Sequence, residues 1–132
     1  MFDGCRILIV DDNKDSCEIM SLILTYSNNS YDITAAHTAQ EALDLIKTRD
    51  FDLYILDNRL PDASGIDLCD RIRETDRLTP IIFYSALSGE MFEKAAKEAG
   101  ADEYLVKPDD MDIFAQVVQK NMQQCFAEQR LH

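Results

Sequence analysis

The stretch Leu53-Tyr54-Ile55-Leu56-Asp57 decides the fold of this chain. Four apolar residues in succession indicate a strand that is buried on both faces, and the carboxylate after them opens a turn-rich segment at 58–65. An open α/β sheet places its chemistry where parallel strands end and loops begin. We therefore expect a parallel sheet covered by helices, with Asp57 at its functional edge.

Short apolar runs alternate with amphipathic stretches five times along the 132 residues. The predicted strands are Cys5–Val10, Tyr31–Ala36, Asp52–Asp57, Pro80–Ser85 and Glu103–Val106. Strict β-α alternation predicts an α/β fold, a doubly wound five-stranded parallel sheet with right-handed crossovers and helices on both faces. No linker or repeat divides the chain, so we expect a single domain over 1–132 with a core of about 5–127.

Several helix boundaries also have sequence signals. Thr38 with Glu41, and Ser64 with Asp67, fit capping boxes before the second and third helices. Gly100 is suited to end the fourth helix in a left-handed turn.

The composition excludes several classes of function. The formal net charge is -12, and so acidic a surface repels phosphate backbones, which argues against direct nucleic-acid binding. No apolar run has the length of a membrane span, and the segment before Asp11 is too short for a signal sequence. We expect a cytoplasmic protein.

The four cysteines have no metal-binding spacing. Cys5, Cys17, Cys69 and Cys125 lie far apart, with no C-x-x-C motif and no nearby pair of histidines, which argues against zinc. Cys5 opens a strand and the other three lie on helical stretches. We therefore expect reduced thiols with at least some burial.

Polar residues follow four of the predicted strands. They are Asp11 and Asp12 after the first strand, Asp57 after the third, Ser85 at the end of the fourth and Lys107 after the fifth. Singly, each has an ordinary structural explanation as a helix cap, a turn residue or a surface lysine. Together they are specific, because they fall at the carboxyl ends of different strands. Paired carboxylates there suit Mg²⁺, which is usually held by one or two carboxylates plus water and phosphate oxygens.

The sequence resembles the receiver domains of two-component response regulators over essentially its whole length. The matching segments are 7–13, Leu56-Asp57 with Leu60-Pro61 and Gly65, 81–86, and 104–108. This resemblance implies the strand order 2-1-3-4-5 of flavodoxin-like sheets. It also implies a cis peptide bond between Lys107 and Pro108.

The resemblance assigns roles to the residues of the site. It implies that Asp57 is the phosphoacceptor, that Ser85 and Tyr104 are the switch hydroxyl and the switch aromatic, and that Lys107 contacts the phosphate. The implied Mg²⁺ ligands are the carboxylates of Asp11, Asp12 and Asp57 and the backbone carbonyl of Arg59.

The function implied by this resemblance is a phosphorylation-activated signalling switch rather than a turnover enzyme. The phosphoryl donor would be a histidine kinase or a histidine phosphotransfer protein. A downstream protein would read the face made by the fourth helix, the fifth strand and the fifth helix. Four apolar residues near that face are expected to belong mainly to the core: Met91, Phe92, Met111 and Phe114.

The sequence departs from the common family pattern at two positions. Ser85 stands where many members have threonine, which keeps the hydroxyl group but removes a methyl group. Arg59, two residues after the acceptor, is a bulky cation. In the family, that position and the one that Leu87 occupies here tune the lifetime of the phosphate.

Two other classes of protein fit parts of the pattern. A small metal-dependent phosphohydrolase also forms an aspartyl phosphate, but it usually needs an acidic residue two positions after the nucleophile, where this chain has Arg59. A flavodoxin-like electron carrier needs a loop rich in Ser, Thr and Gly after the first strand. Asp11-Asp12-Asn13 is anionic instead.

Overall fold

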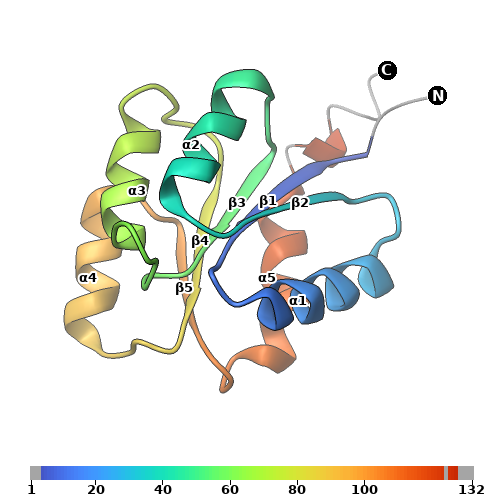
Figure 1. Cartoon of the computed structure of the whole chain (residues 1–132). Helices are drawn as coiled ribbons and strands as arrows, with labels where there is room; N and C mark the ends of the chain where they lie inside the picture. Colours follow the sequence, from blue (N-terminus) through green and yellow to red (C-terminus); the bar gives the residue numbers. More distant parts are fainter. Residues whose placement is uncertain (1–3, 124, 128–132) are drawn as a thin grey trace.

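The computed structural model describes residues 4–123 and 125–127. Its strands form one parallel sheet and are β1 (Arg6–Val10), β2 (Asp32–Ala36), β3 (Leu53–Leu56), β4 (Ile81–Ser85) and β5 (Glu103–Val106). The helices are α1 (Lys14–Ser27), α2 (Ala39–Thr48), α3 (Gly65–Arg73), α4 (Glu90–Ala99) and α5 (Met111–Asn121). The strand order is β2-β1-β3-β4-β5, which confirms the doubly wound topology (Figure 1).

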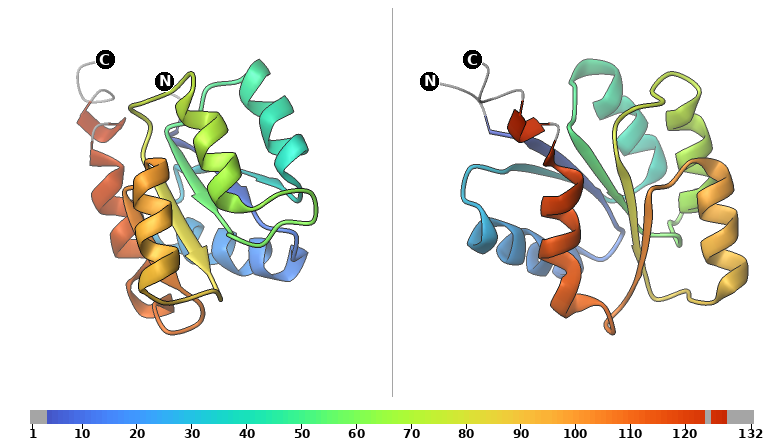
Figure 2. Two further views of the ribbon diagram at one scale, coloured as in Figure 1. Left: turned by 90° about the vertical axis from the view of Figure 1, so that its left-hand side faces the viewer. Right: turned by 180° about the vertical axis from the view of Figure 1, so that it is seen from behind.

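The sheet lies between two helical layers, as Figures 1 and 2 show. Ile7 and Ile9 of β1 belong to the apolar cluster that α1 and α5 complete. Leu8 and Val10 belong to the cluster that α2, α3 and α4 complete on the opposite face. All four side chains are fully buried. Because both faces are covered, the central strands consist of uninterrupted apolar residues, as parallel strands usually do.

Three helices begin at the residues that cap them. The side-chain oxygens of Asn13, Thr38 and Ser64 each accept a hydrogen bond of 3.0 Å from the backbone N–H three residues further on. Gly100 ends α4 with a φ of 110°, a left-handed conformation that glycine adopts without strain. The predicted caps are therefore confirmed. None of the helices in the described part of the chain is long and apolar enough to cross a membrane.

The prediction that four apolar residues near α4 and α5 belong to the core is only partly right. Phe114 is fully buried and Phe92 is partly buried. Met91 is 80% exposed and Met111 is 41% exposed, so the prediction is wrong for both. For Met91 the reason lies in how α4 packs: its one buried residue is Ala96, and a helix that docks through a small side chain leaves its longer apolar residues in solvent. Met111 is the first residue of α5, which buries Phe114 and Val118 instead.

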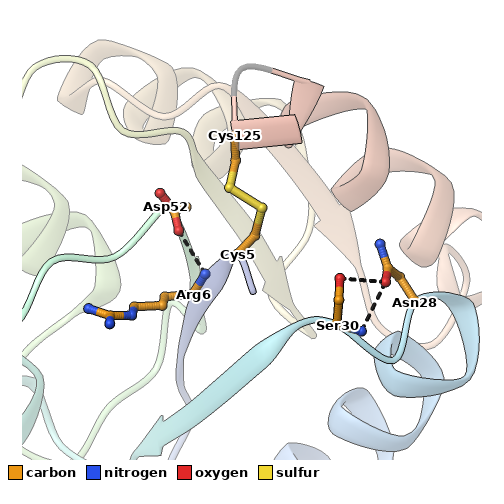
Figure 3. Close-up of a disulfide and its surroundings, with 6 residues drawn as sticks. All are labelled: Cys5, Arg6, Asn28, Ser30, Asp52 and Cys125. Atoms are coloured by element: carbon orange, nitrogen blue, oxygen red, sulfur yellow. Dashed lines mark hydrogen bonds between the residues drawn. A yellow bond between two sulfur atoms is a disulfide. The ribbon is translucent and has the colours of Figure 1, made fainter. Parts of the chain in front are cut away.

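The prediction of reduced cysteines is wrong for two of the four. Cys5 and Cys125 form a disulfide bond (Figure 3). The fold brings their Cα atoms to 6.2 Å, within the range that a disulfide requires, although 120 positions separate the two residues in the sequence. Cys17 and Cys69 are free and buried, as expected.

Candidate functional site

The carboxyl ends of β1 and β3 bring three carboxylates together. Val10 and Leu56 are paired in the sheet, and the backbone N–H of Asp57 donates to the carbonyl of Val10 at 2.9 Å. The residue after each strand therefore lies beside its counterpart. One carboxylate oxygen from each of Asp11, Asp12 and Asp57 lies within 4.8 Å of the other two. The predicted convergence of these residues is thus observed in the fold.

The three carboxylates differ in exposure. Asp11 is 1% exposed, and its Oδ1 accepts a hydrogen bond of 2.9 Å from the backbone N–H of Asn13. The side chain of Asp57 is 12% exposed, and Asp12 is exposed to solvent. Asp57 Oδ1 accepts from the backbone N–H of Arg59 at 3.2 Å, while the Arg59 side chain itself points into solvent. Asp11 is therefore held in place by burial and by its hydrogen bond, whereas Asp12 and Asp57 are open to an incoming group.

Lys107 extends from the end of β5 into this cluster. Its Nζ donates a hydrogen bond to Asp11 Oδ2 and lies 3.5 Å from Asp57 Oδ2. The ammonium also lies 5.6 Å from the centroid of the Tyr84 ring, a favourable position for a cation. The Lys107–Pro108 peptide bond is cis, as expected from the family resemblance. One positive charge thus contacts two of the three carboxylates.

Burial and charge act in opposite directions on the groups of the site. Burial raises the pKa of Asp11, and the charge of Asp57 adds to this effect, while the hydrogen bond from Lys107 opposes it. Burial acts to lower the pKa of Lys107, but its hydrogen bond to Asp11 and the charges of Asp11 and Asp57 outweigh burial and raise that pKa. Lys107 therefore stays an ammonium at neutral pH.

Ser85 and Tyr104 converge on Leu87, in the loop after β4. Ser85 is 1% exposed, and its Oγ accepts a hydrogen bond of 3.2 Å from the backbone N–H of Leu87. The Tyr104 hydroxyl donates to the carbonyl of Leu87 at 2.6 Å. The Tyr104 ring stacks on Phe83, with ring centroids 5.5 Å apart. The loop that follows β4 is thus connected to both residues through one backbone unit.

The loop after Asp57 depends on two further residues. Asp62 accepts hydrogen bonds from the backbone N–H groups of Ala39 and Gln40, at 2.9 and 3.0 Å, and so ties this loop to the first turn of α2. A Cβ atom at Gly65 would lie 2.3 Å from the carbonyl oxygen of Asp57. Gly65 therefore allows α3 to begin in direct contact with the site.

The sequence analysis missed two residues that hold Asp11. His37 Nδ1 lies 2.9 Å from the carbonyl oxygen of Asp11, and the Cys17 thiol donates to the same oxygen at 3.4 Å. His37 directly follows β2, so the rule that singled out the other strand ends would have found it. Cys17 lies inside the apolar stripe of α1, and its position there indicates only burial.

This geometry supports two chemical tasks. Oxygen ligands from clustered carboxylates are what a hard divalent cation prefers. An ammonium beside them can neutralise charge on transferring phosphoryl oxygens. A cation and a phosphoryl group can therefore occupy the same edge of the sheet.

The comparison with protein families agrees with this geometry. The response regulator receiver domain model matches residues 7–119. The chain is a response regulator receiver domain. Among curated relatives, this receiver domain is 37% identical over 113 residues to response regulator ArlR of Staphylococcus haemolyticus, a match over 85% of this chain and 50% of that protein. It is 36% identical over 107 residues to response regulator ArlR of Staphylococcus aureus, covering 81% and 48%. The chain thus spans about half the length of these relatives.

Solved structures show the same fold. A two-component response regulator from Clostridium difficile superposes on this receiver domain with a TM-score of 0.85 at 28% identity, covering 92% of this chain and 98% of that one. The non-phosphorylated HemR receiver domain from Leptospira biflexa gives a TM-score of 0.82 at 31% identity, covering 91% and 95%. The receiver domain is therefore a module of the two-component response regulator type.

Proposed function

We propose that this receiver domain accepts a phosphoryl group on Asp57 from a phosphohistidine and acts as a Mg²⁺-dependent signalling switch. One observation carries the proposal: three carboxylates gather within 4.8 Å of one another, and Lys107 lies 3.5 Å from Asp57. The donor is the phosphohistidine of a histidine kinase or of a histidine phosphotransfer protein. We propose further that the chain is one domain over 1–132 with its core at about 5–127.

The cluster has the chemistry that Mg²⁺ requires. The carboxylates of Asp11, Asp12 and Asp57 and the backbone carbonyl of Arg59 would hold the cation, and all four ligands are oxygen atoms. When bound, Mg²⁺ supplies positive charge that offsets the repulsion among the carboxylates and the charge on the phosphoryl oxygens. The partial exposure of Asp57 leaves one of its oxygens accessible to the donor.

The chain's own residues perform the transfer. A carboxylate oxygen of Asp57 attacks the phosphorus atom, an O–P bond forms, and the P–N bond to the histidine breaks. The imidazole leaves with the electron pair of that bond and takes up a proton. Lys107 keeps its proton, since its pKa is raised, and donates hydrogen bonds to the phosphoryl oxygens. The product is an acyl phosphate on Asp57.

Ser85 and Lys107 connect the phosphate to the rest of the fold. A hydrogen bond to a charged group contributes roughly 1.5–3 kcal/mol, so two of them supply about 3–6 kcal/mol. Inverting a 1:99 equilibrium takes about 5.5 kcal/mol. These two contacts reach that value only near the upper end of their range, so the switch is feasible when the inactive state is modestly favoured. Because Ser85 Oγ and Tyr104 both bond to Leu87, a Ser85 that turns to the phosphate changes the surroundings of Tyr104.

The surface beside Lys107 is suited to a protein donor. A cavity of about 180 Å³ adjoins the site and is lined mainly by α1 and by the segment that leads into α5. Ile19 and Met111 line it and are 48% and 41% exposed. Exposed apolar residues that surround a reactive group are typical of a protein-binding surface. We therefore propose that the donor protein docks on this surface, over α1.

Phosphorylation by a small-molecule donor tests the proposal directly. Wild type incubated with acetyl phosphate and Mg²⁺ should gain the mass of one phosphoryl group, measured on the intact protein. Asp57→Asn should gain none, because an amide is not a nucleophile for phosphorus. Asp32→Asn, an exposed carboxylate on β2, is the matched control and should behave as wild type.

Two results would contradict the proposal. Retention of the mass gain in Asp57→Asn would remove Asp57 from its role. Turnover of a phosphate ester far above one equivalent per chain would indicate a phosphohydrolase instead of a switch.

A further inference from the structure

The Cys5–Cys125 disulfide lies at the end of the sheet opposite to Asp57. Cys5 comes directly before β1, and Asp11 directly follows the same strand, so the bond and the carboxylate cluster occupy opposite ends of β1. Cys125 lies in a helical segment at 125–127, after α5. Figure 3 shows the bond joining this segment to the start of β1. The bond therefore fastens the residues after α5 to the start of an interior strand of the sheet.

The two sulfur atoms differ in accessibility. Cys5 is 0% exposed and belongs to the apolar cluster beneath α1 and α5. Cys125 is only partly buried. Cys125 is thus the less buried residue of the pair, so we expect a thiol reagent to attack its sulfur first, with Cys5 as the leaving group.

The surroundings of the bond show what it holds in place. Phe126, next to Cys125, stacks on Tyr31 at the start of β2, with ring centroids 6.2 Å apart. The disulfide and this ring contact attach the 125–127 segment to the residues that directly precede β1 and β2. Without the covalent bond, the segment keeps only non-covalent contacts, among them this ring contact and the hydrogen bond from the Phe126 N–H to the Met122 carbonyl, against the entropy that it gains when it detaches.

Asp52 places a negative charge beside the sulfur atoms. One of its oxygens lies within 4.8 Å of both of them, and its Oδ2 accepts a hydrogen bond of 2.7 Å from the backbone N–H of Arg6. The backbone of β1 thus holds a carboxylate close to both sulfur atoms.

The other two cysteines are unsuited to the same chemistry. Cys17 and Cys69 are buried, and burial raises the pKa of each thiol to about 11. Both stay protonated at neutral pH, and a protonated thiol is a poor nucleophile. Among the cysteines that the structure describes, Cys5 and Cys125 are the pair whose sulfur atoms lie at bonding distance.

We propose that Cys5 and Cys125 are a reversible thiol–disulfide exchange site that fastens or releases the segment after α5 in response to a low-molecular-weight disulfide, independently of Asp57. In a reducing compartment cellular thiols keep cysteines reduced, and disulfides there are usually transient or redox-sensing. The bond then forms when the ratio of disulfide to thiol rises. The receiver domain thereby gains a second input, at the end of the sheet away from its acidic cluster.

The exchange balances with glutathione disulfide as the oxidant. The Cys125 thiolate attacks one sulfur of glutathione disulfide, the S–S bond breaks, and one glutathione leaves. The Cys5 thiolate then attacks the Cys125 sulfur, forms the protein disulfide and expels the second glutathione. Two electrons pass from the cysteines to glutathione disulfide, and the two cysteine protons end on the two glutathione thiols.

Redox titration of the whole chain tests the site. The protein is equilibrated at graded ratios of glutathione to glutathione disulfide, and free thiols are then alkylated under denaturing conditions. Wild type should lose two alkylation sites in one two-electron step, and peptide mapping should place the bond between Cys5 and Cys125. Cys69→Ala should show the same step, because Cys69 takes no part in it.

Single variants test the order of attack. Cys5→Ser should accumulate one glutathione on Cys125, and Cys125→Ser should accumulate none on the buried Cys5. Reduction of wild type should also cause loss of hydrogen-exchange protection at 125–127, with protection in β3 retained. This last readout needs no variant, so a variant that fails to fold does not leave the proposal untested.

Four outcomes would overturn the proposal. The first is that wild type keeps all its thiols at every ratio, and the second is that Cys5→Ser takes up no glutathione. The third is that the reduced protein binds one Zn²⁺ and thereby resists oxidation, which would make the two sulfurs and Asp52 a metal site. The fourth is loss of the redox step in Asp57→Asn, which would contradict its independence of the acidic cluster. Failure of Asp57 phosphorylation alone leaves these readouts unchanged.

Discussion

Replacement of Asp57 by asparagine should make the protein more stable when no divalent cation is present. One carboxylate oxygen of Asp57 lies within 4.8 Å of a carboxylate oxygen of Asp11 and of one of Asp12. At this upper limit each pair of unit charges repels by about 3.5 kcal/mol at an effective dielectric constant of 20. The attraction between Asp57 and Lys107, 3.5 Å apart, offsets about 4.7 kcal/mol of that repulsion at the same dielectric constant. Removing the charge of Asp57 therefore relieves a net repulsion of at least about 2 kcal/mol, or about 0.5 kcal/mol at the dielectric constant of water.

Urea unfolding in the presence of EDTA measures this difference. With a typical dependence of about 1.5–2 kcal/mol per molar, the unfolding midpoint of Asp57→Asn should lie roughly 0.3–1 M above that of wild type. Asp32→Asn removes the same charge from an exposed position on β2 and should leave the midpoint unchanged. Addition of Mg²⁺ should stabilise wild type more than Asp57→Asn, because the variant has lost one charged ligand.

The pH dependence gives a second check on the same reasoning. Burial raises the pKa of Asp11, so the contribution of Asp11 to stability is most favourable at acid pH and is lost as the pH rises through its folded pKa. The advantage of Asp57→Asn should therefore be largest at neutral pH and shrink on acidification. An Asp57→Asn midpoint at or below that of wild type at pH 7 in EDTA would refute the electrostatic account of the site.

Three further predictions concern the residues around the site. Ser85→Ala should still gain one phosphoryl group by intact mass but lose the phosphate-dependent spectral change at Tyr104, and an unaltered spectral change would contradict the role of the hydroxyl group. Asp62→Ala should cost about 1 kcal/mol of unfolding free energy at pH 7, as loss of a helix cap usually does. Hydrogen bonds from the backbone N–H groups of Ala39 and Gln40 lower the pKa of Asp62. The stability that Asp62 contributes is therefore present above the ordinary Asp pKa of about 3.9 and is lost as the pH falls through the folded pKa. In thermal unfolding the difference between wild type and Asp62→Ala should disappear at acid pH, and a difference that persists there would show that the carboxylate is not responsible. Gly65→Ala should lower stability by about 1–3 kcal/mol, because its Cβ would overlap the Asp57 carbonyl; an unchanged urea midpoint would show that the start of α3 can shift freely.

The fold could be predicted from the sequence because both faces of the sheet are covered. Leu53–Leu56 is apolar throughout, and only a strand between two layers tolerates that pattern. The convergence of Asp11, Asp57 and Lys107 followed from the same inference, since parallel strands deliver their carboxyl ends to one edge. The strand order and the cis peptide bond came from family resemblance, because alternation alone is compatible with several orders.

Contacts between distant segments could not be predicted in this way. The Cys5–Cys125 pairing depends on where the residues after α5 meet β1. The two cysteines are 120 positions apart, and no local sequence pattern indicates that they pair. The cap that Asp62 provides for α2 likewise joins two loops whose proximity appears only in the folded chain. Met91 was misplaced for a related reason: its helix packs through Ala96, and periodicity does not reveal how much of a narrow apolar stripe a neighbouring helix covers.

Adjacent residues of β1 point to opposite faces of the sheet and pack against different helices. Ile9 supports the layer that leads from α1 to the disulfide, whereas Leu8 supports the layer that holds the loop after Asp57 in place through α2 and α3. A substitution that leaves a cavity at Ile9 or Leu8 therefore loosens the helices on one face of the sheet and leaves those on the other face tightly packed. Both layers nevertheless support the acidic site, because Cys17 of α1 bonds to the carbonyl of Asp11 and Gly65 lets α3 begin in contact with Asp57.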